Sequence, residues 1–407
     1  MGWNDRLDIE NRFFFHTIED QLVCVNCLND TGLKRHVHEQ VAPNSETCSY
    51  CEKVGHTIPV EDLQSYMMNF FPYARCVDEL PWVDGEYHGK NHDEDETLEM
   101  FVGTTVCDEL YQDFYDNLIQ EQYCQSNWAS LTPTEQWVYQ WREYREVIQP
   151  DGTGFKLVLN KSDEDRNHDE PHPAGFHNAI STALLRADAL SVLPFGNEIH
   201  RVRFGHHEQS FKELTAPPAE VAAINRFSPK GVSLFYGSSD LDTAGLEIKA
   251  KADDPITHGI FRTTKDLALI DFTAAQFPDG DFDPSWVTDY HISSFLKGFL
   301  KDIRKEVKGE GSDKDYIPTQ ALCHFFRTDG AEHLSMVNMS DPAPIPAMQL
   351  INKTQRIDGI CFRSSKGTDR TCYVLFYDNE TSADILELEE TSHSTFVPKP
   401  DVKEFLF

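Results

Sequence analysis

The sequence predicts an α+β protein, because strand-like runs dominate its second half and only a few helix-like segments interrupt them. From about Phe195, short runs rich in β-branched and aromatic residues are separated by turn residues. These runs are EIHRVRF, GVSLFYG, ALIDFT, GICFRS and CYVLFYD. Two segments with apolar residues at helical spacing intervene, at residues 289–309 and 317–326. Strands with so few intervening helices favour α+β over a regular βαβ alternation.

The composition bounds the function classes. The chain has 407 residues, which predicts two or three domains, and its net charge of −32 argues against non-specific binding to nucleic acid. The N-terminal residues show no signal-peptide pattern, and no apolar stretch approaches the roughly 18 residues of a membrane span. We therefore expect a cytoplasmic protein with no membrane partner. A tight protein partner would present a basic face to this acidic chain.

Two CxxC pairs near the N-terminus predict a structural zinc site. The cysteines, with twenty residues between the pairs, are Cys24, Cys27, Cys48 and Cys51. Each pair can turn two thiolates toward one point, and four thiolates complete a tetrahedron with no open position for catalysis. The alternative is four reduced cysteines that only pack together. A nearby histidine could also replace one ligand: His36, His38 or His56.

The predicted domain boundaries follow changes in residue composition and in the pattern of apolar residues along the chain. Residues 10–160 hold the zinc-binding segment and several helix-like segments. Residues 161–195 begin with a charged, proline-containing run, which predicts a linker or loop. Residues 196–380 form the β-rich domain, and residues 381–407 are predicted as an acidic C-terminal tail.

The linker contains a weak nuclease signal. Arg166 and His172 stand in an Arg-Asn-x4-His order that resembles the ribonuclease motif of HEPN helical domains. That motif needs a helix to aim both side chains, and this charged segment is a poor helix. A ribonuclease is therefore the least favoured function for this chain.

An arginine, a tyrosine and a glutamate recur at even intervals in RFSPKGVSLFYGSSDLDTAGLEIK. Arg226 precedes a turn, Tyr236 lies near the end of the next strand, and Glu247 lies about two turns into a helix capped by Ser239 or Asp240. Each residue alone has a structural explanation. Arg226 could form a surface ion pair, Tyr236 could be half-buried in the sheet, and Glu247 could be an exposed helical residue. Together they suit a dinucleotide, because arginine grips phosphate, tyrosine stacks on a flat ring and glutamate holds ribose hydroxyls.

Two further segments extend this set. In HRVRF, Arg201 and Arg203 are two residues apart, so they share one face of a strand. In DGICFRSSKG, Ser364 and Ser365 follow another predicted strand. Neither a GxGxxG nor a P-loop motif is present, so neither a Rossmann nor a P-loop nucleotide site is indicated.

Five ordered motifs resemble the RES domain, which is named for Arg, Glu and Ser. They are HRVR, NRFSPKG, LFYGSSDLDTAGLE, YIPTQALCHFF, and DGICFRSS followed by CYVLF, over about His200 to Phe376. The CxxC segment ahead of helices also resembles the zinc-binding N-terminal domain of the HEPN/RES type. Cys372 stands where the family pattern leads us to expect asparagine.

The resemblance implies an ADP-ribosyltransferase-like fold and a toxin of the toxin–antitoxin type. Such proteins destroy NAD⁺ at the nicotinamide–ribose bond. The family's catalytic set falls on Arg226, Tyr236, Glu247 and Ser364. Its substrate-binding set falls on Arg201, Arg226 and Tyr236, with Arg203 and Ser365 as adjacent choices.

Three functions remain open from the sequence. The first is an NAD⁺-degrading toxin or defence effector, held by an antitoxin protein with a basic face. The second is an enzyme of the same fold that transfers ADP-ribose to a macromolecule, and the third is a non-enzymatic, zinc-stapled interaction protein. A homo-oligomer is compatible with all three, and the acceptor could be water, phosphate or a macromolecule.

Overall fold

The computed structural model describes most of the chain. The described residues are 15–40, 46–70, 75–76, 80–89, 91–119, 122–124, 131, 133–151, 154–159, 171–275, 280–283, 295–303, 312–340, 345–364 and 370–398. They fall into two compact units, which are described here one at a time. The first contains Met1–Gln136 and Phe277–Ser294, and the second contains Trp137–Gln276 and Phe295–Phe407.

The first unit consists of short helices and very short strands. In chain order its elements are β1 (Leu22–Cys24), η1 (Val25–Cys27), α2 (Thr31–Gln40), β2 (Thr57–Pro59), α3 (Val60–Met68), β3 (Arg75–Cys76), β4 (Trp82–Val83), β5 (Glu86–Tyr87), β6 (Asn91–Asp93), α4 (Glu94–Phe101), α5 (Asp108–Asp116) and β7 (Gln122–Cys124). β1 pairs with β2, so the strand that ends at Cys24 lies beside the segment that follows the second CxxC pair. Apolar residues of α2, α3, α4 and α5 form one core with these strands.

The second unit contains the longer strands and helices. Its helices and 3₁₀ turns are α6 (Pro133–Val147), which begins just before the unit boundary, η4 (Pro173–Gly175), α7 (Phe176–Arg186), α8 (Phe211–Leu214), η5 (Ala219–Val221), α9 (Leu241–Glu247), the helical residues 295–303, η6 (Ser312–Tyr316), α11 (Ile317–Thr328), α12 (Gly330–Ser340), α13 (Pro346–Thr354) and η7 (Thr381–Asp384). Its strands are β8 (Ile148–Asp151), β9 (Gly154–Leu157), β10 (Leu190–Leu193), β11 (Glu198–Phe204), β12 (Phe235–Ser238), β13 (Pro255–Thr263), β14 (Leu267–Asp271), β15 (Gly359–Arg363), β16 (Thr371–Leu375) and β17 (Leu386–Thr395).

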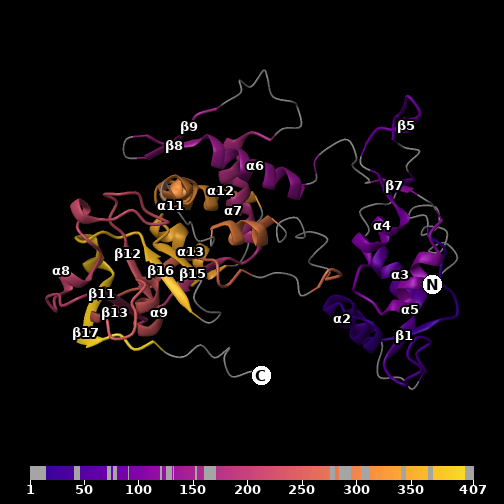
Figure 1. The fold of residues 1–407 in the computed structure, drawn as a ribbon, viewed down its shortest axis with the longest axis horizontal. Coiled ribbons are helices and arrows are strands. Elements are labelled where there is room, and N and C mark those ends of the chain that lie inside the picture. The colour runs from indigo at the N-terminus through magenta and orange to yellow at the C-terminus, as the bar shows by residue number, and fades with distance from the viewer. Residues whose placement is uncertain are drawn as a thin grey trace. The chain divides into compact units, whose positions relative to one another are not determined.

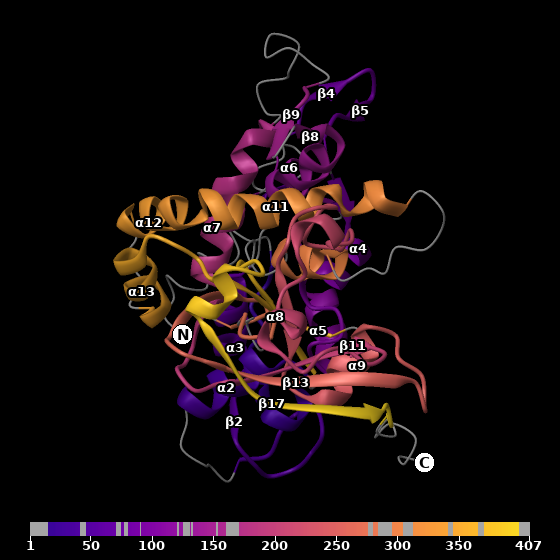
Figure 2. The same ribbon diagram turned by 90° about the vertical axis from the view of Figure 1, so that its left-hand side faces the viewer.

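Eight strands of the second unit form one sheet in the order β10-β14-β15-β16-β12-β11-β13-β17. The β14–β15 pair is parallel and the other pairs are antiparallel. Helices α7, α11 and α12 gather away from the β13–β17 edge, where the two strands run side by side (Figures 1 and 2). This mixed sheet with segregated helices confirms the α+β prediction. Among the described residues, every helix is too short or too polar to cross a bilayer.

Alternation along the strands gives the sheet two different faces. Ile199 of β11, Phe235 of β12 and Phe261 of β13 lie in one apolar cluster on the first face. On the other face, Val202 of β11 packs in a second cluster with α9. Consecutive residues of a strand therefore point to opposite faces of the sheet. The site residues on β11 and β12 are divided between the two faces by the same alternation.

The chain departs from the predicted linker and tail. Residues 161–195 contain α7 and β10, and β10 is one edge of the eight-stranded sheet. Residues 381–407 contain β17, which pairs with the whole of β13 and forms the other edge. Local charge led to the prediction of coil in both places, but edge strands tolerate polar residues because one side faces solvent.

Helix α6 also differs from the predicted boundary at residue 160. Its Trp141 packs on Phe176 of α7, with ring centroids 5.0 Å apart, and on Phe299, 5.1 Å away. These are contacts within the second unit. The aromatic stripe of α6 therefore joins the core of the sheet-bearing unit, while the cysteine segment belongs to the first unit.

Candidate functional site

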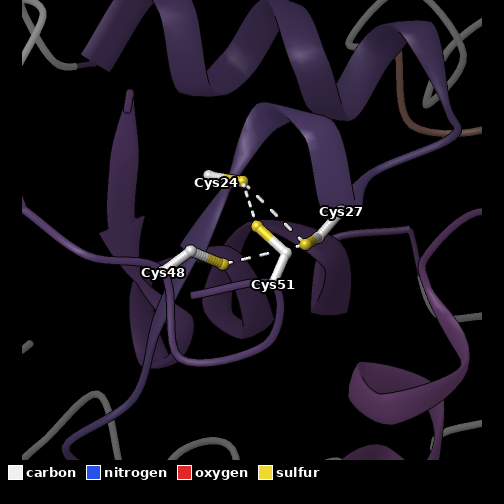
Figure 3. Close-up of side chains that lie close together, drawn as sticks. All are labelled: Cys24, Cys27, Cys48 and Cys51. Atoms are coloured by element: carbon white, nitrogen blue, oxygen red, sulfur yellow. Dashed lines mark hydrogen bonds between the residues drawn. The ribbon is translucent and has the colours of Figure 1, made fainter. Parts of the chain in front are cut away.

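Four cysteine side chains of the first unit converge on one point. Cys24 Sγ lies 3.9 Å from Cys27 Sγ and 3.5 Å from Cys51 Sγ, and Cys27 Sγ lies 3.7 Å from Cys48 Sγ. All four sulfurs lie within 4.8 Å of one another (Figure 3). A tetrahedron with Zn–S bonds of about 2.3 Å has S···S edges of about 3.8 Å, so the arrangement fits zinc. A disulfide bond, at about 2.05 Å, is far shorter than any of these distances.

The surroundings shift the pKa values of the four-cysteine cluster in different directions. Burial raises the pKa of Cys24 and of Cys27, which disfavours their charged forms when no cation is bound. Burial also acts on Cys48, but hydrogen bonds from the backbone at Cys51 and Tyr50 outweigh it and lower its pKa to about 7. A divalent cation would compensate the buried negative charge of the full set.

Three nearby histidines do not join the cluster. His36 stacks on Tyr66 with ring centroids 3.6 Å apart, and the Nδ1 atoms of His38 and His56 lie 3.1 Å from each other. In the described part of the chain, the metal-ligating group consists of cysteines alone. The structure therefore favours the four-cysteine reading over the histidine-substituted one.

Arg226 lies in a loop that α11 holds in place. Thr319 of α11 donates a hydrogen bond from Oγ1 to the carbonyl of Arg226, at 2.7 Å. Gln320 of the same helix donates from Nε2 to the carbonyl of Asn225, at 2.8 Å. Both contacts are made with the backbone, so they fix the path of the loop that carries the Arg226 side chain.

Tyr236 comes from β12 and reaches back to the same loop. Its hydroxyl lies 3.0 Å from Ser228 Oγ. Burial raises the pKa of Tyr236, so the phenol is neutral at physiological pH and can donate a hydrogen bond. The loop that carries Arg226 and the strand that carries Tyr236 are thus joined by a side-chain contact.

Arg201 lies where β11 and β12 part. The described residues of these strands pair at a single position, His200 with Ser238, which leaves the carbonyl of Tyr236 free to accept a hydrogen bond from Arg201 Nη1. The guanidinium also lies over the Phe235 ring, 5.1 Å from its centroid. Burial, together with Arg203, lowers the pKa of Arg201 to about 9.

Both strand arginines keep unused donors. Arg203 donates from Nη2 to the carbonyl of Thr215 at 2.9 Å, and burial lowers its pKa. The Nε atoms of Arg201 and Arg203 are buried and make no hydrogen bond in the described structure. A buried donor with no partner is costly, and an anionic ligand is one way to satisfy it.

Glu247 is the last residue of α9, a short helix with a well-defined start. Asp240, one of the two predicted caps, is the N-cap and accepts a hydrogen bond from the Thr243 amide at 2.8 Å. At the other end, the Glu247 carboxylate accepts a hydrogen bond from Ser364 Oγ. Ser364 is buried directly after β15, 117 residues away along the chain.

The structure therefore brings the predicted residues together in two groups. Arg201 meets the backbone of Tyr236, and Glu247 meets Ser364. Strand β12 connects the groups, because Tyr236 and Ser238 point to the same face, and Ser238 contacts the strand that follows Ser364. Ser365, the adjacent alternative to Ser364, and Arg166 of the nuclease-like motif lie outside the described residues.

Two supports of Glu247 escaped the sequence reading. A buried ion pair joins Asp242 of α9 to Arg370 before β16, with Oδ2 and Nη2 2.7 Å apart. Gly245 of α9 lies against Phe396, where a Cβ atom would come within 2.1 Å of the ring. A glycine inside a short helix is a signal of close packing, whereas nothing in the sequence pairs Asp242 with Arg370.

The fold and site define an α+β protein with a cluster of four cysteines in its first unit. In the second unit, arginine and tyrosine side chains come from the sheet, and a glutamate at the end of α9 contacts a serine after β15. The family model of the RES domain matches residues 198–342, and that of HEPN/RES N-terminal domain 1 matches residues 42–152. The chain thus joins an HEPN/RES N-terminal domain to a RES domain. A RES domain implies NAD⁺ as substrate and an enzyme of the ADP-ribosyltransferase-like type.

The matched ranges and the structural units do not coincide. The N-terminal match extends to residue 152 and includes α6, which packs in the second unit, while Ser364 lies beyond the end of the RES match. Comparisons with curated proteins and with solved structures found no match.

Proposed function

We propose that this protein consumes NAD⁺ by breaking the bond between nicotinamide and ribose, as a toxin or defence effector. The observation that carries the proposal is the contact between Glu247 and Ser364. It joins the end of a helix to the end of a strand far away in the sequence, at the two positions that the RES motifs select. A carboxylate held by a buried hydroxyl is a fixed negative charge, which is what a developing ribose cation requires.

The chemistry of the bond assigns the role of Glu247. Departure of nicotinamide leaves an oxocarbenium-like ribose, similar to the transition state of glycoside hydrolysis. The Glu247 carboxylate would accept hydrogen bonds from the ribose hydroxyls and stabilise that positive charge. Ser364 would hold the carboxylate or the nicotinamide amide in place. The leaving group takes the electron pair of the broken bond, and an acceptor nucleophile such as water attacks the ribose carbon.

The arginines suit the anionic part of the substrate. A pyrophosphate offers oxygens to the unused donors of Arg201, and the Arg226 loop lies beside Tyr236 through Ser228. Tyr236 has an aromatic face for stacking and a neutral hydroxyl. Arg203 donates to Thr215, so we assign it to the support of the strand end, with Arg201 as the phosphate ligand.

The cysteine cluster would hold a structural Zn²⁺ ion. The four sulfurs match the edge lengths of a zinc tetrahedron and leave no position for substrate. The expected role is to stabilise the short strands and turns around η1. Metal analysis of the purified protein should give one zinc per chain, and replacement of Cys48 by serine should abolish it.

The decisive experiment compares the purified protein with its Glu247→Gln variant. NAD⁺ loss and nicotinamide release are followed by chromatography, and the variant should be slower by about 100-fold or more, since it keeps the shape but not the charge. Glu220→Gln is the matched control, because Glu220 is an exposed glutamate in η5 of the same unit. The control should keep the wild-type rate.

The products identify the acceptor. Free ADP-ribose indicates water, a phosphorylated product indicates phosphate, and labelled protein or nucleic acid with little free ADP-ribose indicates transfer to a macromolecule. A wild-type protein that consumes no NAD⁺ with any of these acceptors would refute the proposal.

A further inference from the structure

Cys372 of β16 lies inside the group that holds Glu247. It is buried, and it pairs with Ser238 of β12 on one side and with Phe362 of β15 on the other. Ser238 Oγ lies 3.8 Å from Cys372 Sγ. The thiol therefore occupies the middle of the sheet, between the strand that carries Tyr236 and the strand that leads to Ser364.

The same thiol interacts with both members of the Glu247–Ser364 pair. Burial, and then the negative charge of Glu247, raise the pKa of Cys372 to about 12. Ser238 and Ser364 act on this pKa in the opposite direction. A thiol that stays protonated in the physiological range can donate a hydrogen bond but cannot act as a nucleophile.

The strand register explains why these groups meet. Paired residues of antiparallel strands point to the same face, so Ser238, Phe362 and Cys372 share the face on which α9 packs. The Ser364 amide donates to the carbonyl of Arg370, which brings the end of β15 to the start of β16. The carboxylate at the end of α9 accepts a hydrogen bond from Ser364, and the Cys372 thiol, itself next to Ser238, lies on the same face of the sheet.

We propose that Cys372 is a positioning residue for Glu247. Its thiol donates to the carboxylate together with Ser364, and the two donors fix the carboxylate in one orientation toward the ribose. This inference rests on the proposed NAD⁺-consuming function for its kinetic consequence. Its structural content, the coupling between Cys372 and Glu247, stands independently of that function.

The kinetic test uses Cys372→Ala and Cys372→Ser. Alanine removes the donor, so kcat for NAD⁺ loss should fall by roughly 10- to 100-fold while KM changes little, because misplacement of a catalytic group affects the transition state more than ground-state binding. Serine keeps a donor and should restore most of the rate. Cys361→Ala is the matched control, since Cys361 is an equally buried cysteine in the neighbouring strand β15, on the opposite face.

A second measurement keeps the inference testable if the protein proves inactive. Unfolding is measured for Cys372→Ala, Glu247→Gln and the double variant, and in parallel for Cys361→Ala with Glu247→Gln. The Cys372 cycle should be non-additive and the Cys361 cycle additive, because only contacting residues couple.

The outcomes separate the two proposals. Wild-type NAD⁺ consumption with an unaffected Cys372→Ala variant, or an additive Cys372 cycle, overturns the positioning role and leaves the proposed function intact. No NAD⁺ consumption with a non-additive Cys372 cycle refutes the proposed function and supports the coupling.

Discussion

Arg201 is a largely buried cation that no carboxylate neutralises among the described residues. Its charge is partly compensated by the Tyr236 carbonyl and the face of the Phe235 ring. Burial lowers its pKa, and a base whose pKa is lowered by folding destabilises the folded state wherever the unfolded residue is charged. The protein keeps this residue at a cost in stability, which fits a group that binds an anion.

We expect Arg201→Met to separate stability from binding. The free energy of unfolding without ligand should fall by less than about 1 kcal/mol, or rise, because the variant removes a buried charge that is only partly compensated. KM for NAD⁺ should rise by about tenfold or more, with the loss of a charge-assisted hydrogen bond. Thermal unfolding without NAD⁺ measures the first effect, and initial rates of NAD⁺ loss measure KM. The rise in Tm on adding NAD⁺ reports binding directly, since a ligand that binds only the folded state raises Tm.

Arg262→Met is the control for that variant. Arg262 of β13 pairs with Glu198 and Glu389, and all three side chains are partly exposed. This variant should keep the stabilisation by NAD⁺. An Arg201→Met protein that NAD⁺ still stabilises as strongly as the wild type would remove Arg201 from the binding site.

Single residues of the site could be predicted from the sequence only where a motif marked them. Arg226, Tyr236 and Glu247 were found by their spacing in one continuous stretch. Ser228 was not, although it contacts the Tyr236 hydroxyl, because a serine in a Ser-Pro turn is ordinarily explained by the turn itself. Whether Arg201 or Arg203 faces the ligand depends on where β11 leaves β12, which is a tertiary property.

At the level of elements, α9 depends on contacts that lie far away in the sequence. It has only seven residues, too few to be stable alone, so its position is set by packing. The Asp242–Arg370 ion pair holds it to the start of β16, and the close contact of Gly245 with Phe396 holds it to the segment after β17. Glu247 is at the end of this helix, so any shift of α9 moves the carboxylate.

Asp242→Asn should therefore weaken both stability and activity. Removing the carboxylate takes away the ion-pair partner of the largely buried Arg370 guanidinium and leaves only the charge interaction with Asp240, which should lower the free energy of unfolding by about 3 kcal/mol. NAD⁺ consumption should fall with it at temperatures where the variant is still folded. Chemical denaturation and nicotinamide release measure the two effects.

The exposed Lys156–Asp151 pair of the β8–β9 hairpin gives the comparison. Asp151→Asn should change the free energy of unfolding by less than about 1 kcal/mol, because solvent screens exposed pairs. Equal effects of the two variants would show that α9 is held by apolar contacts alone.

The sheet shows which elements the sequence could predict. The strands with β-branched and aromatic runs, such as β12 and β16, were visible from composition, and the cap of α9 from Asp240. Strand β17 was not, because its sequence LELEETSHST is acidic and polar. It is an edge strand whose residues are mostly exposed, so backbone pairing with β13 and not side-chain burial defines it.

At the level of the whole molecule, a short segment of the residues matched by the RES family model packs in the first unit. Residues 280–283 lie inside the matched RES residues but pack with the cysteine-bearing unit. Phe282 is 1% exposed in that core, with its ring centroid 5.5 Å from that of Phe70 and 5.7 Å from that of Phe101. Sequence patterns assign this piece to its neighbours in the chain, and only tertiary contacts reveal its place.

Polar contacts fix the same segment to α2 and α3. The Asp281 amide donates to Asp30 Oδ2 at 2.5 Å, and the Tyr66 hydroxyl donates to the Phe282 carbonyl at 2.6 Å. Arg35 pairs with Asp283 at 2.7 Å. Asp30 also accepts a hydrogen bond from the Leu33 amide in the first turn of α2, which begins four residues after Cys27. The residues that bind the 280–283 segment thus include Asp30, which lies just after the first cysteine pair.

We therefore predict that removing the metal releases residues 280–283. Without a cation, the four cysteines no longer share a ligand, and the turns that precede α2 lose their cross-link. Hydrogen–deuterium exchange after treatment with a chelator should rise in peptides that cover residues 22–40 and 280–283. Peptides from β13 and β14 should be unchanged, because the cysteine cluster lies in the other unit. Added zinc should restore protection in both affected regions together.

A variant in the segment itself completes the test. Phe282→Ala should lower the free energy of unfolding of the first unit by about 3 kcal/mol, since it empties a buried aromatic site. It should also raise exchange at residues 280–283 with zinc still bound. If the chelator exposes residues 22–40 while 280–283 keep their protection, the segment is held by the aromatic core of α3 and α4 alone. The metal would then support only the turns around η1, and residues 280–283 would stay packed in the first unit in the metal-free protein.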